Sequence, residues 1–259
     1  MHSAFSNLQS SIYSCSSVQV TGTVKAIVGM TLTVGGLESL AGIGSRCRVH
    51  SKNGIIEGEV VGAQGSELCL LPFGTWNGVA IGDPVKLVEH DDVIHPDDSW
   101  IGTVVDALGQ PLSAFTRVRR PQRKSKFRAD PPRAFDRKKV GEKLETQIKC
   151  IDIFTPICRG QRMGVFAGSG VGKSTMMAML ARNTDADVIV IGLIGERGRE
   201  VQQFIQEDLG EKGMARAVVV VSTGDEAPLL RKQAALTTTA IAEHFKSQGK
   251  QVLLLLDSV

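Results

Sequence analysis

Apolar residues follow different patterns in the two halves of the chain. Between Thr21 and His90, short runs rich in β-branched residues alternate with glycine-containing turns, as in "TGTVKAIVG", "SRCRVHS" and "SELCLLPF". Strands this short, with turn signals at this spacing, are typical of a small closed or nearly closed β-barrel. We therefore predict a barrel domain over residues 20–92, after a mobile lead-in over residues 1–19 that carries little periodic signal.

From Ile148 onward, apolar runs alternate with longer segments of helical periodicity. Near-continuous apolar strands separated by helices are typical of a mostly parallel sheet covered on both faces. Residues 145–259 are therefore predicted to form an α/β domain, in which ligands bind at the carboxyl ends of the strands. We expect strands at 162–168, 187–195, 215–223 and 250–257, and helices at 173–183, 199–213 and 227–249.

Residues 93–144 have the texture of a connector, with five prolines and one strand-like piece, "WIGTVVDALGQPLS". Between Arg117 and Val140 lies a basic run with eleven Lys and Arg against two Asp, although the net charge of the whole chain is only +3. Two interpretations of this run stay open: a surface for phosphates or an acidic partner, and a solvated interdomain loop.

The cysteines and histidines bear on the redox compartment and on a possible metal site. The five cysteines are scattered without a C-x-x-C pair, which favours a reducing compartment over a disulfide framework. His90 and His95 lie in "EHDDVIHPDD", where a solvated acidic loop is favoured over a metal site. No apolar run approaches the ~20 residues that a membrane-spanning helix needs, and the N-terminus lacks a signal-peptide pattern, so we expect a soluble intracellular protein.

The stretch "AGSGVGKS", Ala167 to Ser174, lies between a predicted strand and a predicted helix. It fits the phosphate-binding pattern G-x-x-x-x-G-K-[ST], except that Ala167 replaces the first glycine. In this pattern, successive N–H groups point at phosphate oxygens, the lysine reaches the β- and γ-phosphates, and the hydroxyl binds Mg²⁺. The alternative, a glycine-rich turn with a chance lysine, is disfavoured by the strand-loop-helix context. The predicted nucleotide-binding residues are Gly168, Ser169, Gly170, Val171, Gly172, Lys173, Ser174 and Thr175.

Two acidic residues follow later strands. Glu196, in "IGLIGERGRE", stands where a carboxylate can accept a proton from an attacking water, with Arg197 or Arg199 neutralising phosphate charge. On position alone, an ordinary helix N-terminus explains Glu196 equally well. Asp257 ends the leucine-rich run "VLLLLD" and has the form of an aspartate that holds Mg²⁺ through a coordinated water, although such strands are common.

The motifs "FAGSGVGKST", "GERGRE" and "LLLLDSV", in this order and spacing, resemble the rotary-type ATPases related to the catalytic subunit of ATP synthase. The stretch "LETQIKCIDIFTPICRGQRMGVFAGSGVGKSTMMAMLAR" is similar to the flagellum-specific type III export ATPases, and the resemblance extends from about Thr21 to Val259. It implies a RecA-like P-loop NTPase domain after an N-terminal β-barrel, an ATPase activity that depends on ATP and Mg²⁺, and a water-activating role for Glu196. Gln147 departs from the glycine that relatives commonly carry at this turn.

The resemblance also implies an assembly. It points to a homohexameric ring with active sites between neighbours, at the inner face of the cell membrane. The implied partners are a peripheral-stalk-like regulator, a central-stalk protein, and exported flagellar proteins with their chaperones. It further implies that the sequence stops before the arginine donated across the interface, the adenine pocket and the last strands of the sheet, so that this piece alone would be inactive.

Two other functions stay open. The ATPases of virulence injectisomes share every motif quoted above. A ring-shaped RNA translocase also joins a barrel to a related ATPase core, but such proteins read single strands with stacked aromatics. We expect no nucleic-acid partner, because the aromatics of the first hundred residues are few and are not grouped with basic residues: Phe5, Tyr13, Phe73, Trp76 and Trp100.

Overall fold

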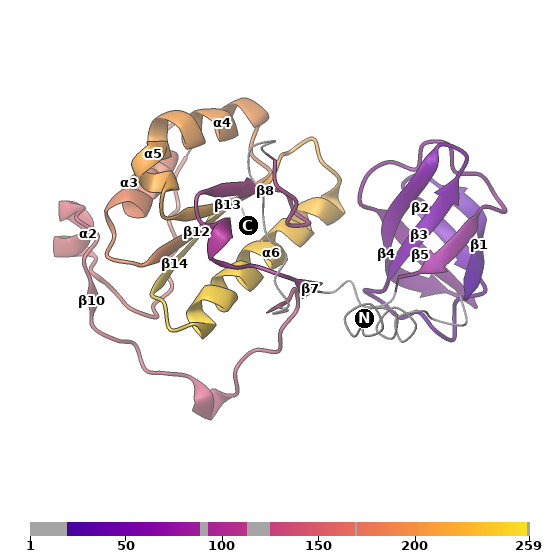
Figure 1. The fold of residues 1–259 in the computed structure, drawn as a ribbon, viewed down its shortest axis with the longest axis horizontal. Coiled ribbons are helices and arrows are strands. Elements are labelled where there is room, and N and C mark those ends of the chain that lie inside the picture. The colour runs from indigo at the N-terminus through magenta and orange to yellow at the C-terminus, as the bar shows by residue number, and fades with distance from the viewer. Residues whose placement is uncertain (1–19, 89–92, 113–124, 169, 258–259) are drawn as a thin grey trace, which may run out of the picture. The chain divides into compact units, whose positions relative to one another are not determined.

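The computed structural model of the chain describes residues 20–88, 93–112, 125–168 and 170–257. The chain forms two compact units, one up to Asp91 and one from Asp92 (Figure 1). The predicted lead-in over residues 1–19, the histidine at position 90 and the first part of the basic run lie outside the described residues.

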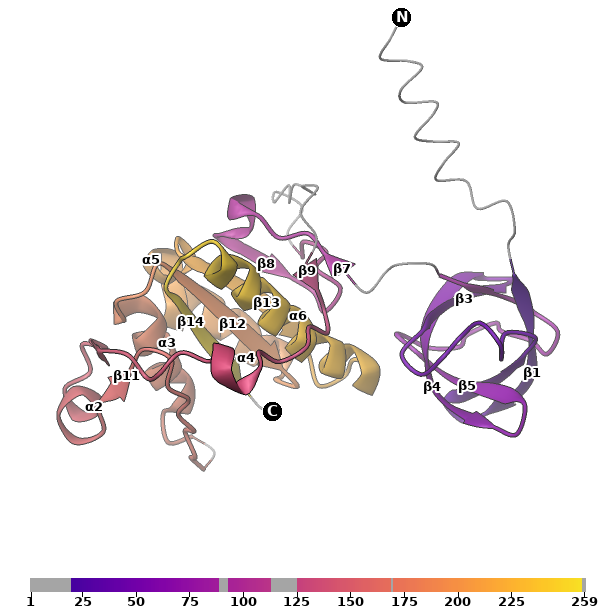
Figure 2. The ribbon, with the colours of Figure 1, turned by 90° about the horizontal axis from the view of Figure 1, so that it is seen from below.

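The first unit is a closed antiparallel barrel, as predicted, with strand order β1-β2-β5-β4-β3-β6. Figure 2 shows the ring of strands. Closure pairs the strands without leaving a free sheet edge. In β2, β3 and β5 buried and more exposed residues alternate, so every second side chain fills the interior. The strands are β1 (Thr21–Val28), β2 (Thr31–Gly35), β3 (Arg46–Ser51), β4 (Gly54–Gln64), β5 (Glu67–Pro72) and β6 (Pro84–Leu87).

The second unit contains a parallel sheet of order β14-β12-β13-β8, which confirms the α/β prediction. Its strands are β8 (Thr103–Val105), β12 (Val188–Ile194), β13 (Ala217–Ser222) and β14 (Val252–Asp257). Every residue of β12 and β13 is buried, as expected for strands covered on both faces. β8 comes from the strand-like piece of the connector and pairs with β13.

Helices cover both faces of this sheet (Figure 1). α6 (Pro228–Ser247) packs on one face through Ile241 and Phe245, together with Val188 and Val190 of β12. The opposite face takes Ile189 and the other alternate residues of β12, packed against α3 and the helices that follow β12. Those elements are α3 (Lys173–Asn183), α4 (Gly198–Gln203), a π-helical stretch (Phe204–Leu209) and α5 (Gly210–Met214).

Shorter elements complete the unit. β7 (Val93–Ile94) pairs with β9 (Ser125–Lys126), and β10 (Lys143–Leu144) pairs with β11 (Ile157–Cys158), just beyond α2 (Lys149–Phe154). Two short 3₁₀ turns lie at Asp98–Trp100 and Ala134–Asp136. Within the described part of the basic run, Phe127 is buried, whereas residues 128–140 are exposed. In the described part of the chain, no helix combines the length and the apolar character needed to cross a membrane.

The strand predicted over residues 162–168 is wrong: residues 161–168 belong to no helix or strand. A strand needs a neighbour that takes up its backbone N–H and C=O groups. β14 pairs with β12 along one edge, and no strand among the described residues lies along its other edge. A cavity of about 1160 Å³, lined by residues 161–168 and by β14, occupies that side instead.

Gln147 takes a backbone conformation that favours glycine. Its φ is +59°, and among the described residues it is the only non-glycine residue with positive φ. The turn around it is fixed by Asp152, whose carboxylate accepts hydrogen bonds from the N–H and the hydroxyl of Thr146. The left-handed conformation therefore has a conformational cost at this position, which glycine would remove.

We predict that Gln147→Gly raises the free energy of unfolding by up to about 1 kcal/mol, because glycine adopts positive φ without a Cβ clash. The matched control is Gln202→Gly in the exposed part of α4, where glycine should instead cost about 0.5–1 kcal/mol. Thermal unfolding followed by circular dichroism measures both changes. A loss of stability in both variants would contradict the assigned strain.

Candidate active site

The glycine-rich loop has the backbone that its sequence predicts. Gly170 and Gly172 have φ of +76° and +95°, and Gly172 caps α3 in the left-handed conformation. A Cβ on either glycine would meet no atom within 4 Å, so conformation and not crowding requires glycine there. Among the described residues, no side chain caps the N-terminus of α3, and the first turn of α3 carries no acidic residue. The loop thus offers N–H groups and a helix N-terminus to an anion.

Lys173, the first residue of α3, lies between two acidic residues from two strands. Its Nζ is 2.5 Å from Oδ1 of Asp257 and 3.9 Å from Oε1 of Glu196. Asp257 ends β14, and Glu196 follows β12 by two residues. The two strands are parallel, and Leu193 of β12 pairs in register with Asp257, so both strands end at the same edge. This register brings the two carboxylates to the start of α3.

The two acidic neighbours of Lys173 stabilise its positive charge. The side chain of Asp257 is 5% exposed, that of Glu196 is 22% exposed and that of Lys173 is 31% exposed. The hydrogen bond to Asp257 raises the pKa of Lys173, against the opposing effect of partial burial, and the negative charges of Asp257, Glu196 and Glu200 add to the rise. Lys173 therefore keeps its positive charge throughout the physiological pH range.

A small hollow beside this cluster brings together oxygen-bearing side chains. It is lined by Ser174, Glu196, Glu200 and Asp257, with Leu193, Val201 and Phe204 as apolar walls. Hydroxyl and carboxylate oxygens are the ligands that Mg²⁺ prefers. The described residues contain no group of three or more His, Cys, Asp or Glu that could hold a metal ion by themselves. The donor set therefore fits a Mg²⁺ that brings most of its oxygens from phosphates and water.

Glu200 and Arg231 were not singled out from the sequence. Glu200 lies in the first turn of α4, where a negative charge interacts favourably with the helix dipole. Its side chain nevertheless also lines the hollow. Arg231 of α6 has a buried Nε that makes no hydrogen bond within the described part of the chain, and its Cδ lies beside Gly195. Only the "GERGRE" spacing, with a second glutamate four residues after Glu196, could have drawn attention to Glu200.

Arg197 lies outside the cluster. Its side chain is 84% exposed, and its guanidinium is 3.6 Å from the carboxylate of Glu200. The exposed Val171 continues the loop, whereas Ser169 lies outside the described residues. The structure thus brings together Lys173, Ser174, Glu196 and Asp257 of the predicted site residues, and it leaves Arg197 at the surface.

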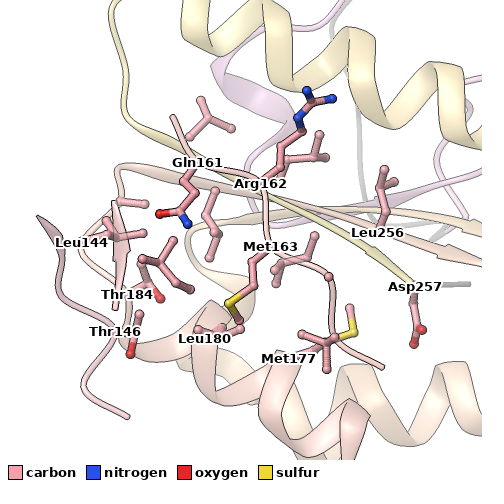
Figure 3. A pocket seen from close by; sticks show the side chains of 18 of the residues that line it. Leu144, Thr146, Gln161, Arg162, Met163, Met177, Leu180, Thr184, Leu256 and Asp257 are labelled. Atoms are coloured by element: carbon pink, nitrogen blue, oxygen red, sulfur yellow. The ribbon is translucent and has the colours of Figure 1, made fainter. Parts of the chain in front are cut away.

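The large cavity meets this cluster only at one end. Asp257 lies at that end, while Leu144 and Thr184 lie at the other (Figure 3). Between them the lining follows β14, the stretch 157–168 and the α3 residues Met177 and Leu180. The cavity is therefore longer than a phosphate site and runs beside the whole of β14.

One family model matches most of the second unit. Residues 147–259 match the nucleotide-binding domain of the ATP synthase alpha/beta family. This match covers the glycine-rich loop, Glu196 and Asp257, which together are the residues of the cluster described above.

Curated proteins that match most of the chain are named flagellum-specific ATP synthases. The chain is 42% identical over 242 residues to the flagellum-specific ATP synthase of Caulobacter vibrioides, across 93% of this chain and 54% of that protein. It is 39% identical over 241 residues to the flagellum-specific ATP synthase of Bacillus subtilis, across 92% of this chain and 54% of that protein. The chain thus spans about half the length of the curated relatives it matches.

A solved structure shares the fold. The assembled ATPase EscN of the type III secretion system of enteropathogenic E. coli superposes with a TM-score of 0.81 at 34% identity, over 92% of this chain and 57% of that chain. The same ATPase with its central stalk EscO gives a TM-score of 0.83. The resemblance to the type III export ATPases is confirmed, and with it the P-loop fold behind a β-barrel.

We predict that Lys173→Ala in the complete protein weakens nucleotide binding at least about tenfold, so that micromolar ATP no longer binds. The reason is the loss of a charged donor that lies at the mouth of the loop. Lys212→Ala, on the exposed face of α5, is the matched control and should bind as the wild type does. Fluorescence titration with ATP measures all three proteins, and unchanged affinity in Lys173→Ala would exclude a phosphate role for this lysine.

Proposed function

We propose that the complete protein hydrolyses ATP with Mg²⁺ and thereby energises protein export through a type III apparatus. The observation that carries this proposal is the meeting of Lys173, Glu196 and Asp257 at the mouth of the glycine-rich loop. The relatives support it, because they are named as flagellum-specific ATP synthases and as a type III secretion ATPase.

Some residues of the site bind the substrate and the metal, and others act in the hydrolysis step. The N–H groups of the loop and Nζ of Lys173 would hold the phosphates, and Ser174 and Asp257 would hold Mg²⁺, Asp257 through a water. Bound Mg²⁺ neutralises negative charge on the phosphates. The carboxylate of Glu196 orients the attacking water and accepts its proton. Arg197 would have to turn away from Glu200 to reach a phosphate.

The assembly and its partners are part of the proposal. We infer a homohexameric ring with a central-stalk partner, supported by the solved structures of an assembled ATPase and of its complex with a central stalk. A peripheral-stalk-like regulator, exported proteins and their chaperones are the other proposed partners, and the proposed location is the cytoplasmic face of the cell membrane. These follow from the resemblance to the export ATPases.

The flagellar system is favoured over a virulence injectisome. The flagellum-specific relatives reach 42% identity, whereas the injectisome ATPase EscN reaches 34% over a comparable share of the chain. An RNA translocase is disfavoured by the barrel. Its described aromatics are only Phe73, which is buried beneath Arg46, and Trp76, which packs partly buried against the barrel core, so the described barrel residues form no group of exposed aromatics for stacking bases.

We predict that Glu196→Gln in the complete protein lowers the rate of ATP hydrolysis ~10²- to 10⁴-fold, because glutamine keeps the size of the side chain but cannot accept the proton. Affinity for Mg-ATP should stay within about threefold, since the loop and Lys173 are unchanged. Phosphate release measured beside ATP binding separates the two effects.

The matched control is Glu207→Gln, the same substitution at an exposed position of the π-helical stretch, which should leave both values unchanged. Near-normal turnover in Glu196→Gln would mean that Glu196 only stabilises the N-terminus of the helix that follows it, α4. Hydrolysis stimulated by single-stranded RNA in the same assay would favour the RNA translocase over the export ATPase.

A further inference from the structure

The contact between Lys173 and Asp257 joins two groups that nucleotide binding needs apart. Nζ of Lys173 lies 2.5 Å from Oδ1 of Asp257, and the aspartate side chain is only 5% exposed. A charge-assisted hydrogen bond of this length, with one partner buried, is stronger than an exposed ion pair. In the proposed function, however, Lys173 binds phosphate and Asp257 binds a hydrated Mg²⁺. Phosphate binding therefore requires this pair to open.

The free-energy cost of opening the pair between Lys173 and Asp257 depends on whether a metal ion arrives with the nucleotide. Once Lys173 turns to a phosphate, Asp257 is left as a buried carboxylate without its cation, which is costly. Glu196 and Glu200 add two more negative charges within the same hollow. Metal-free ATP adds further negative charge beside them, whereas Mg-ATP brings a cation to the carboxylate that Lys173 has just left.

We propose that Asp257 holds Lys173 in a closed pair that Mg-nucleotide opens readily and metal-free nucleotide does not, so that Asp257 selects the metal-bound form of the substrate. This inference rests on the proposed function and adds to it. Asp257 has two roles in it: counterion of Lys173 before nucleotide binds, and partner of the metal afterwards.

The inference differs from a role as magnesium ligand alone. A carboxylate that only holds Mg²⁺ acts on metal-free ATP through charge repulsion alone, as Glu196 does, so its removal would weaken Mg-ATP binding and strengthen metal-free binding no more than removal of Glu196 does. A counterion of Lys173 competes with the phosphates, so its removal would strengthen the binding of metal-free ATP. The size of the gain in the absence of metal, compared with the gain in Glu196→Gln, distinguishes the two roles.

The test measures ATP affinity of the complete protein by titration calorimetry, once in excess EDTA and once in excess Mg²⁺. In EDTA, Asp257→Asn should bind ATP about tenfold more tightly than the wild type, which corresponds to about 1.4 kcal/mol. In Mg²⁺ its affinity should be equal to or weaker than that of the wild type. The preference for Mg-ATP over metal-free ATP should thus shrink by about tenfold or more.

Two controls separate release of Lys173 from a general loss of negative charge. Asp98→Asn removes a surface carboxylate that pairs with Lys250, and it should leave both affinities unchanged. Glu196→Gln removes a local charge that is 3.9 Å from Nζ, and it should strengthen metal-free binding by less than about threefold, because the interaction weakens with distance and exposure.

Unchanged or weaker metal-free binding in Asp257→Asn, beside a wild type that binds Mg-ATP, would overturn the inference and leave the proposed function standing. A gain in Glu196→Gln as large as in Asp257→Asn would also overturn it, because the effect would then be one of charge alone. If the wild-type protein binds no nucleotide in either condition, both the inference and the proposed function are wrong. If circular dichroism shows that Asp257→Asn does not fold, Asp257→Ser carries the same test, with the same sign expected.

Discussion

The register between β12 and β14 is the constraint on which the site depends. Leu193 pairs with Asp257, so two parallel strands end level with each other, and the loop after β12 carries Glu196 to the same edge as Asp257. α3 begins at that edge with Lys173, whose ammonium lies between the two carboxylates. A shift of β14 by one residue would turn Asp257 to the other face of the sheet. The buried apolar residues of β12 and the partly buried ones of β14 pack in the same clusters and hold the register, and thereby the distance between Lys173 and Asp257.

Much of the fold could be predicted because its signals are local. The glycines and Lys173 mark the start of α3, the β-branched runs and turns mark the barrel, and the apolar runs mark β12, β13 and β14. Residues 162–168 also carry an apolar pattern but form no strand, because a strand also requires a neighbour, which no local pattern reveals. The barrel differs in this respect, since its six strands supply each other's partners.

The site was predictable only where a motif names a residue. The phosphate-loop pattern gives Lys173 and Ser174, and the resemblance gives Glu196 and Asp257. Glu200 was missed because a glutamate in the first turn of a helix has an ordinary explanation, and its place in the hollow depends on how α4 packs. Arg197 was expected near the phosphates, yet its long side chain reaches Glu200 at the surface. The ion pair between Lys173 and Asp257 depends on three-dimensional distance, which the spacing of motifs does not contain.

We infer that Lys173 and its two carboxylate neighbours form the phosphate end of a nucleotide site. A structure of the complete protein with Mg²⁺ and a non-hydrolysable ATP analogue tests it most directly. We expect the phosphates to lie against the N–H groups of Gly170 and Gly172, with Nζ of Lys173 on a phosphate oxygen and no longer within 4 Å of Asp257. An analogue bound at the far end of the cavity near Thr184, with Lys173 still paired to Asp257, would contradict it.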